Sequence, residues 1–560
     1  MGTLVRWLFC IGCLLAGWGT VWGEAPAKLA SEGRIDLIPD AQVGHLTGGR
    51  VSGGRGQIGR MNWLPAEQQD RGYTSSLPAT HRTWRAFELT FIPEKSGEVL
   101  VTLMGPWASA GGNEVLRQEL EWDGLTATGT TLANGGFEAP AGWELQGGSI
   151  ATPPADRPAA EGKQIARSWH NGRVSTRLKV LAGQAVTLRG QVRSALPSGY
   201  TEMPRILSRD TPAHRHAQRF LHGVNLGNYL EAPRGQNWGQ DYTTRDFDEI
   251  QKAGFDHVRL PIGWQNYTGP APEYTLEEEI FGKVDFLVNE AIQHKLAVIV
   301  DVHHFDAFTT DPASHRARLL SIWEQIGKRY AKLPETVAFE LLNEPKDAAT
   351  TTVLNPIYAE LISQIRKTNP TRPIFLGPGL WNRVSELNSL QLPLDEQNLI
   401  VTVHSYDPFQ FTHQGTSWSS PEMGKLKGIR FPGPPQTPLA IPSGLPQHLE
   451  EWLTQYNTLP AEQNPCSPRV MQELAGEARE WSVYFGRPVH MGEFGAYVAG
   501  DDVSRVNYCR EYRRAIETHG MGWALWDWSA GFRYWDKDRQ QPVPGMHEAL
   551  FERWEMRDER

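Results

Sequence analysis

Hydrophobic and polar positions follow one pattern in the N-terminal third of the chain and another in the rest. In the N-terminal third, runs such as Arg85–Phe91 and Ala185–Val192 alternate polar and apolar residues, as half-buried strands do. Two further runs of this kind are Glu98–Met104 and Arg117–Trp122, and glycine-rich turns such as Gly111-Gly112-Asn113 separate them. Short alternating strands without a helical period predict an antiparallel, jelly-roll-like β-sandwich.

From residue 222 onward, apolar strand-like runs alternate with helical stretches. Eight strands are expected: His222–Leu226, His257–Ile262, Ala297–His303, Val337–Asn343, Pro373–Gly377, Leu399–His404, Pro488–Gly492 and Gly522–Trp526. Helices are expected between most of them: Gly282–His294, Ser314–Ala331, Asn355–Lys367, Arg469–Phe485 and Ser504–His519. Eight such units over roughly 340 residues predict a (β/α)₈ barrel with enlarged loops.

The largest expected loop runs from Asp407 to Pro465 and is rich in proline. Connections of this length are usually functional or disordered. Because the segment follows the C-terminal end of the sixth strand, we expect it to overhang the face on which barrels build their active sites.

Composition and charge narrow the range of expected binding partners. The formal charge of −9 is mild and no basic block occurs, so neither nucleic acid nor an anionic membrane surface is an expected partner. Arg6 and the apolar stretch Trp7–Trp18 predict a cleaved export signal at 1–23 and a secreted or periplasmic protein. The expected domains are then the sandwich at 28–205 and the barrel at 215–557.

Two cysteines, Cys466 and Cys509, remain after the expected signal. We expect them as buried free thiols, with a disulfide between them as the alternative in an exported protein. The sequence has no calcium loop, zinc spacing, dinucleotide fingerprint or P-loop, so we expect no metal and no cofactor. The oligomeric state is not readable from the sequence.

Polar and aromatic residues end most of the expected barrel strands. They are Arg259, His303, Asn343, Glu344, His404, Tyr406, Glu493 and Trp526. Any one of them alone would more simply be a satisfied structural group or a solvent-facing strand end. Since the C-terminal ends of barrel strands meet at one face, we expect the set to converge there. Two carboxyl groups at such a face are the smallest set of side chains with which most glycosidases cleave a glycosidic bond.

Several barrel segments, taken in order, resemble glycoside hydrolase family 5, a family of retaining (β/α)₈ glycosidases. They are Gly223-Val224-Asn225-Leu226-Gly227-Asn228, Val258-Arg259-Leu260-Pro261, Asn343-Glu344-Pro345, His404-Ser405-Tyr406, Phe411-Thr412-His413-Gln414-Gly415, Gly492-Glu493-Phe494-Gly495 and Trp526-Asp527. Asp527 departs from the family, in which many members have glutamate; we expect this to affect local packing more than chemistry.

The resemblance implies that Glu344 is the acid/base and Glu493 the nucleophile. It gives substrate-binding or supporting roles to Arg259, His303, Asn343, His404, Tyr406 and Trp526. Weaker candidates are His304, which either contacts substrate or only supports His303, and His413 and Gln414, which either shape the cleft or fix the loop after the sixth strand. Trp264, Trp381, Trp418 and Trp535 are either sugar platforms or core residues.

A second resemblance lies in the sandwich. The segment Asn134-Gly135-Gly136-Phe137-Glu138, followed by Gly142-Trp143, is similar to the opening of jelly-roll carbohydrate-binding modules. The similarity is partial, because such modules continue for longer than the distance to the barrel. The sandwich is expected either to bind sugar or to have a purely structural packing role.

The predicted function is a retaining, endo-acting hydrolase of β-1,4-glucan, either cellulose-like or mixed-linkage, that needs no cofactor. Four alternatives use the same two glutamates: a β-mannanase, a xyloglucanase, a β-1,3-glucanase or a transglycosylase. A non-catalytic sugar-binding barrel is disfavoured because both glutamates are present.

Overall fold

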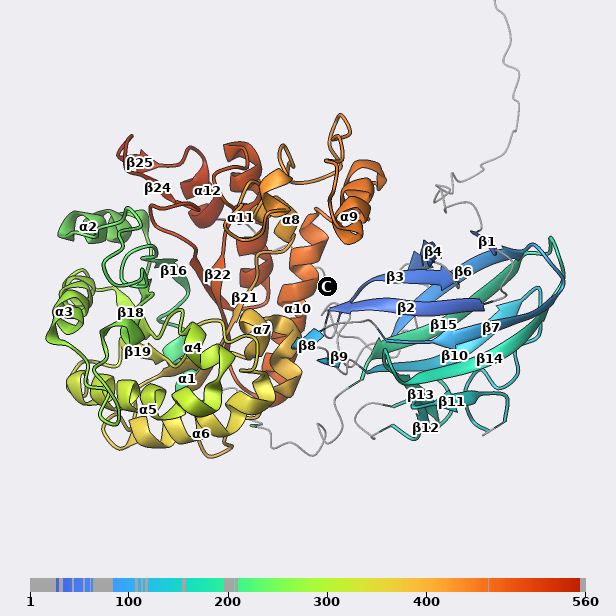
Figure 1. The fold of residues 1–560 in the computed structure, drawn as a ribbon, viewed down its shortest axis with the longest axis horizontal. Helices are drawn as coiled ribbons and strands as arrows, with labels where there is room; N and C mark the ends of the chain where they lie inside the picture. The colour runs from blue at the N-terminus through green and yellow to red at the C-terminus, as the bar shows by residue number, and fades with distance from the viewer. Residues whose placement is uncertain are drawn as a thin grey trace, which may run out of the picture.

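The computed structural model describes residues 27–29, 34–42, 45–53, 56–60, 62–63, 84–105, 109–111, 114–115, 119–139, 141–153, 158–195, 206, 210–461 and 463–553. The expected export signal, 1–23, lies outside the described residues. A β-sandwich and an α/β barrel lie side by side, with α10 (Pro468–Phe485) on the side of the barrel that faces the sandwich (Figure 1).

Two stacked sheets form the sandwich, as the alternating pattern predicted. The first has the order β1-β6-β15-β10-β13-β12, with β5 paired to β6, and the second has the order β11-β14-β7-β2-β3-β4. Their bounds are β1 Ala27–Leu29, β2 Arg34–Gln42, β3 His45–Gly53, β4 Gly56–Arg60, β5 Asn62–Trp63, β6 Arg85–Pro93, β7 Gly97–Leu103, β10 Leu120–Thr128, β11 Glu144–Gln146, β12 Ser149–Ala151, β13 Ile165–Ser168, β14 Arg173–Val180 and β15 Val186–Ser194; β8 (Ser109–Gly111) and β9 (Glu114–Val115) form a separate hairpin. The pairing is antiparallel except for β1 with β6 and β2 with β7, which are parallel.

The core of the sandwich consists of the inward residues of both sheets. Phe87, Val101 and Trp122 are among its buried members, and the Trp122 indole N–H donates to Ser168 Oγ at 2.8 Å. Apolar residues at every second position thus face the opposite sheet, which is the physical basis of the alternation in the sequence.

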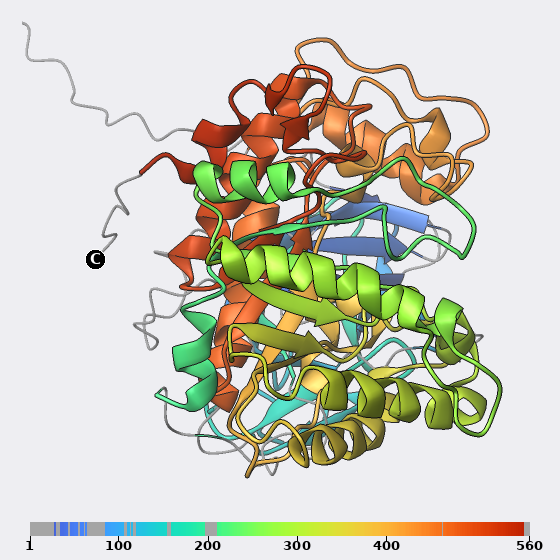
Figure 2. The same ribbon diagram turned by 90° about the vertical axis from the view of Figure 1, so that its left-hand side faces the viewer.

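Eight parallel strands close the barrel in chain order, which confirms the predicted fold class. They are β16 His222–Asn225, β17 His257–Leu260, β18 Ala297–Asp301, β19 Val337–Glu340, β20 Ile374–Leu376, β21 Leu399–His404, β22 Val489–Phe494 and β23 Gly522–Leu525. The helices around them include α2 Thr244–Ala253, α3 Glu278–Gln293, α5 Pro312–Arg329, α6 Thr351–Arg366, α10 Pro468–Phe485 and α11 Asp502–Thr518. Figure 2, which faces the barrel, shows α3 and α5 outside the strands.

Shorter elements complete the barrel domain. They are α1 Pro212–Ala217, η3 Trp264–Tyr267, α4 Asp306–Thr310, α7 Gly379–Asn382, η4 Val384–Ser389, α8 Phe409–Thr412, η5 Met423–Lys425, α9 Gln447–Thr458, β24 Trp535–Asp536, β25 Gln541–Pro542 and α12 Met546–Phe551. The segment 407–465 contains α8, η5 and α9 and extends from the top of the barrel, on the side toward the sandwich, near the middle of Figure 1.

The inside of the barrel changes from apolar to polar along the strands. Ile299, Phe375 and Ile400 belong to an apolar cluster inside the barrel. Two residues farther along β18, Asp301 is also fully buried. Because side chains of a strand alternate, Ile299 and Asp301 share the inner face, and the polar layer lies at the C-terminal end of the strands.

Both cysteines are buried free thiols, which confirms the default expectation and excludes the disulfide. Burial raises the pKa of the Cys509 thiol to about 12, so it stays protonated at neutral pH. Among the helices of the described residues, none is both long and apolar enough to cross a membrane.

Candidate active site

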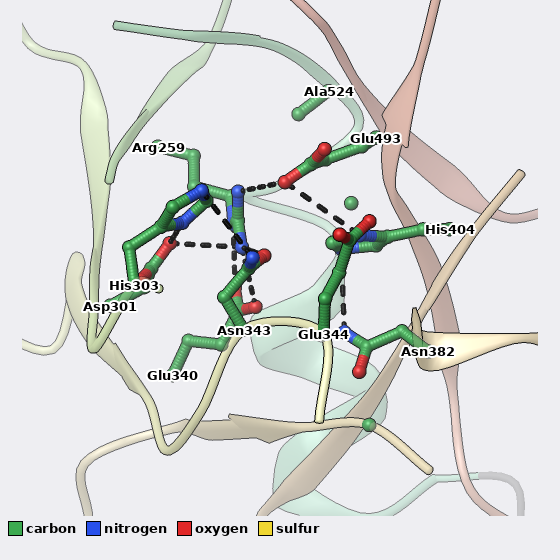
Figure 3. A network of polar contacts seen from close by, with 12 residues as sticks. Arg259, Asp301, His303, Glu340, Asn343, Glu344, Asn382, His404, Glu493 and Ala524 are labelled. Atoms are coloured by element: carbon green, nitrogen blue, oxygen red, sulfur yellow. Dashed lines mark hydrogen bonds and ion pairs between the residues drawn. The ribbon is translucent and has the colours of Figure 1, made fainter. Parts of the chain in front are cut away.

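Arg259 is the centre of the polar layer at the top of the barrel (Figure 3). Its guanidinium is fully buried and holds the Glu340 carboxylate with two parallel hydrogen bonds of 2.8 Å each. It also pairs with Asp301 Oδ2 at 2.9 Å and with Glu493 Oε1 at 2.8 Å. One buried cation therefore neutralises part of the charge of three buried carboxylates, an arrangement that stays stable only while every member is present.

Glu493, at the end of β22, accepts hydrogen bonds that favour its ionised form. Arg259 Nη1 donates at 2.8 Å and the Tyr406 hydroxyl donates at 2.7 Å. The Glu493 side chain is only 5% exposed. A carboxylate with two such donors is both fixed in position and electrostatically stabilised.

Glu344 lies opposite Glu493 with fewer partners. β19 ends at Glu340, earlier than the predicted Val337–Asn343, and Glu344 follows with a left-handed backbone at φ +45°. Its Oε1 lies 3.0 Å from His404 Nδ1, and the side chain is 23% exposed. The sharp turn after β19 aims this carboxyl group into the cleft.

The two carboxyl groups form a coupled pair. Burial raises the pKa of Glu344 to about 7 and that of Glu493 to about 7. A coupled pair loses its protons in two steps. Since Arg259 and Tyr406 both stabilise the Glu493 carboxylate, the first proton leaves Glu493 and the second stays on Glu344 up to about neutral pH.

Distances define what this pair can do. One ligand atom each from Glu344, His404 and Glu493 lies within 4.8 Å of the others. Such a group is within reach of a metal ion, but Arg259, at 2.8 Å from Glu493, opposes a second cation. The separation instead suits two carboxyl groups that flank one reacting bond of a bound molecule.

His303, Asn343 and Trp526 form one wall beside the carboxyl pair. Asn343 Oδ1 accepts from Arg259 at 2.7 Å, and its amide nitrogen lies 3.3 Å from His303 Nε2. The His303 ring stacks on the Trp526 ring, with the ring centroids 5.7 Å apart and an angle of 8° between the ring planes. A Cβ on Gly227 would lie 2.9 Å from the Trp526 ring, so that position has no room for a larger residue.

A cleft of about 1080 Å³ lies in front of Glu344. Its lining includes Trp238, His304, Trp381, Phe409 and Trp418. Trp381 is 46% exposed and Trp418 63% exposed, so both present aromatic faces to solvent. Flat aromatic faces on several loops of one cleft suit a ligand with repeated apolar faces.

Three weaker candidates, and Asp527, have structural roles. Trp264 is fully buried and donates to the Asp301 carbonyl oxygen at 3.0 Å, and Trp535 is buried against Trp528. Neither is a platform at a surface. Gln414 is buried and bonds both the N–H and the C=O of Ile429, so it fixes the loop. Asp527 is buried and accepts from two backbone N–H groups of the following turn, a packing role as expected.

His304 and His413, in contrast, line the cleft. The His413 ring stacks on Phe409, with centroids 4.0 Å apart, and this pair is part of the 407–465 segment. That segment therefore contributes directly to the cleft, as its place after the sixth strand predicted.

The sequence interpretation assigned no role to several polar residues that the structure places at the site. Asn225 accepts from Arg259 at 2.9 Å, and Asp301 accepts from His303 Nδ1 at 3.0 Å. Glu231 lines the cleft, is 2% exposed, and burial raises its pKa to about 7. A usable signal for Asp301 was its position two residues before His303, on the same side of the strand.

Comparison with known proteins gives a consistent result for the barrel. A family model described as "Cellulase (glycosyl hydrolase family 5)" matches residues 217–531. Endoglucanase H of Acetivibrio thermocellus is 30% identical over 305 residues, which are 54% of this chain and 29% of that protein. Endoglucanase C of the same organism is 26% identical over 335 residues, 57% of this chain and 95% of that protein.

Solved structures of Thermotoga maritima Cel5A are also similar. A complex with cellobiose is 32% identical, with a TM-score of 0.53, and covers 60% of this chain and 99% of its own. A complex with mannotriose is 32% identical, with a TM-score of 0.52 and the same coverage.

Proposed function

Because the chain belongs to glycosyl hydrolase family 5, we propose that it is a retaining endo-β-1,4-glucanase in which Glu493 is the nucleophile and Glu344 the acid/base. The observation that carries the mechanism is the approach of the two carboxyl groups to within 4.8 Å. Retaining pairs lie about 5–5.5 Å apart, whereas an inverting pair needs about 6.5–9.5 Å to admit a water molecule.

In the first step, a Glu493 carboxylate oxygen attacks the anomeric carbon while the Glu344 carboxyl group gives its proton to the leaving oxygen. The glycosidic C–O bond breaks and a glycosyl ester of Glu493 forms. In the second step, Glu344 takes a proton from water, which attacks the same carbon and releases Glu493. Two displacements on opposite faces retain the configuration.

The surrounding residues have separate tasks in this proposal. Arg259 and Tyr406 hold Glu493 ionised in line for attack. The second N–H of the Asn343 amide is available to the sugar 2-hydroxyl, a hydrogen bond that strengthens in the transition state. The half-buried face of Trp526 is the platform on which the reacting sugar stacks.

The relatives support glucan as the substrate, since the two Acetivibrio thermocellus proteins named above are endoglucanases. A mannan is the second candidate, because the similar Thermotoga maritima Cel5A was solved with mannotriose as well as with cellobiose. The cleft is slightly larger than the about 300–1,000 Å³ typical of small-ligand pockets, in keeping with a chain of several sugar units.

A panel of soluble polysaccharides tests the substrate. We expect release of reducing ends from carboxymethylcellulose and barley β-glucan, with a rapid fall in viscosity because internal bonds are cleaved. Release of reducing ends from mannan, xyloglucan or laminarin alone would be consistent with the mechanism but would contradict β-1,4-glucan as the substrate. Longer products from short glucan oligomers would identify a transglycosylase.

The proton on Glu344 gives a prediction about pH. For substrates with a poor leaving group, kcat/KM should fall as pH rises through about 7, because Glu344 then loses the proton that the leaving oxygen needs. For a dinitrophenyl β-cellobioside, whose leaving group needs no proton, this alkaline limb should be absent from the glycosylation step.

The Glu344→Ala variant is the control for this prediction. Its kcat/KM should fall by about 10²–10⁴-fold on cello-oligosaccharides and far less on the dinitrophenyl substrate. Equal losses on both substrates would show that Glu344 is not the acid.

For the sandwich, we propose a structural role on the barrel. Arg85 of β6 lies 3.8 Å from Glu473 of α10, and Ile206, between the sandwich and the barrel, donates its N–H to the Phe485 carbonyl oxygen at the end of α10. Among the sandwich residues whose side chains the structure describes, the exposed large apolar ones are Leu145 and Leu181, neither of which is an aromatic sugar platform. Export, which a polymeric substrate outside the cell would require, remains a prediction.

A further inference from the structure

His404 lies between the two catalytic carboxyl groups. Its Nδ1 is hydrogen-bonded to Glu344 Oε1 at 3.0 Å and lies 3.6 Å from Glu493 Oε1. The side chain is 1% exposed, and burial lowers its pKa to about 4. The imidazole is therefore neutral at working pH and carries one N–H. Beside the ionised Glu493 this N–H is favourable on Nδ1, where it donates to the unprotonated oxygen of Glu344.

Asn382 faces the other ring nitrogen of His404. Its amide nitrogen lies 3.4 Å from His404 Nε2, and the Asn382 side chain has no exposed surface. In this orientation the amide N–H points at Nε2, which must then carry a lone pair, so the single imidazole proton lies on Nδ1 and Asn382 Oδ1 has no hydrogen-bond partner among the described residues. A reversed amide would present its oxygen and would hold the proton on Nε2, away from both carboxylates.

The backbone that carries Asn382 is strained. Leu380, Trp381 and Asn382 are consecutive and left-handed, with φ of 54°, 61° and 54°. Asparagine tolerates this region, but leucine and tryptophan are disfavoured there, because their Cβ atoms come too close to the following carbonyl oxygen. Strained backbone of this kind persists where many surrounding contacts hold it in place, and it is concentrated at functional sites.

Hydrogen bonds tie this strained turn to the catalytic loop. The Trp381 N–H donates to the Pro345 carbonyl oxygen at 3.0 Å, directly after Glu344. The Gly379 N–H donates to Thr351 Oγ1 at 2.9 Å. The turn thus fixes Asn382 relative to the acid/base residue as well as to His404.

The same arrangement occurs a second time in the site. The Asn343 amide nitrogen lies 3.3 Å from His303 Nε2, and His303 Nδ1 lies 3.0 Å from Asp301 Oδ2. In both cases an asparagine faces Nε2 and a carboxylate faces Nδ1 (Figure 3). The second occurrence supports a common tautomer for the two histidines.

We propose that Asn382 is a positioning residue that fixes His404 as the Nδ1–H tautomer, so that its N–H stays on the acid/base Glu344 through both steps. This inference rests on the proposed function. Before the first step the N–H donates to the unprotonated oxygen of the Glu344 carboxyl group and lies beside the ionised Glu493. Once Glu344 has given up its proton, the same N–H donates to its carboxylate. No proton leaves His404, and the acceptor does not change.

The wild-type protein gives the first test, with no substrate present. In protein labelled with ¹⁵N-histidine, the His404 signals are assigned by their loss in His404→Gln. We expect a protonated Nδ1 and an unprotonated Nε2. A protonated Nε2 in the wild type would overturn the proposal.

Asn382→Asp supplies the second test. At pH 8, a carboxylate beside Nε2 should draw a proton to that nitrogen, and kcat/KM should fall by about tenfold to a hundredfold, as for other partners that orient a reacting group. Asn382→Gly, which suits the left-handed backbone and lets water reach Nε2, should lose less. An Nε2 that stays unprotonated in Asn382→Asp, or unchanged activity, would contradict the proposal.

Asn355→Asp is the matched control. Asn355 lies on α6 and donates to the Ser389 carbonyl oxygen at 2.9 Å, outside the catalytic cluster, so its variant should keep wild-type activity and the His404 signals. Because the spectra are recorded without substrate, they do not depend on catalytic activity. If the wild type hydrolyses none of the glycans, the proposed function fails while the tautomer result still stands or falls by itself.

Discussion

Replacing Glu493 with alanine should lower kcat/KM on β-1,4-glucan by at least about 10⁴-fold, the range seen when a nucleophile is removed. The variant lacks the oxygen that attacks the anomeric carbon, while Arg259 and Tyr406, which hold Glu493 at 2.8 and 2.7 Å, remain. Azide should restore part of the activity on an activated aryl glycoside. It enters the space that the carboxylate leaves, and a single displacement there yields the α-glycosyl azide.

Glu290→Ala is the control for this change. Glu290 is a buried glutamate of α3, outside the cleft, and its loss should leave kcat unchanged. A Glu493→Ala variant with near-wild-type activity, or an azide product of β configuration, would remove Glu493 from the role of nucleophile.

Replacing Arg259 with methionine should lower both stability and activity. The substitution leaves Asp301, Glu340 and Glu493 buried without their common cation, and a broken buried ion pair costs about 3–5 kcal/mol of unfolding free energy. We expect a lower melting temperature by calorimetry and a loss of activity of at least about a hundredfold, because Glu493 is no longer held ionised.

Two further variants separate stability from catalysis. Arg372→Met removes a buried arginine that donates to the carbonyl oxygens of Pro334 and Val337, at the start of β19 and away from the site; it should lower stability and leave kcat unchanged. Adding Glu340→Gln to Arg259→Met should recover part of the stability but none of the activity. An Arg259→Met protein as stable as wild type would contradict the charge balance described above.

The barrel and its active face were predictable because hydrophobic periodicity records burial directly. Strands such as β17 and β18 are apolar on both faces, and a polar residue such as Arg259 or Asp301 in that setting must lie inside the barrel. The C-terminal ends of parallel strands then bring these residues together whatever the loops do.

Pairings and backbone turns were not predictable from the sequence. The pattern extended the fourth strand to Asn343, whereas β19 ends at Glu340 and a left-handed turn carries Glu344. Asn382 gave no signal, because its role depends on a strained turn and on a ring nitrogen of another strand. Trp264 and Trp381 are similar in the sequence, yet one is in the core and one is exposed, since tryptophan satisfies either environment.

Trapping the glycosyl ester is the most direct test of the central claim. The wild-type protein would be incubated with dinitrophenyl 2-deoxy-2-fluoro-β-cellobioside. Its fluorine slows both steps, while the good leaving group speeds the first alone, so the glycosyl ester accumulates. The account predicts a covalent adduct that peptide mass spectrometry places on Glu493 and that is absent from Glu493→Ala. An adduct on another residue, or release of an α-configured product from natural glucan without any adduct, would contradict it.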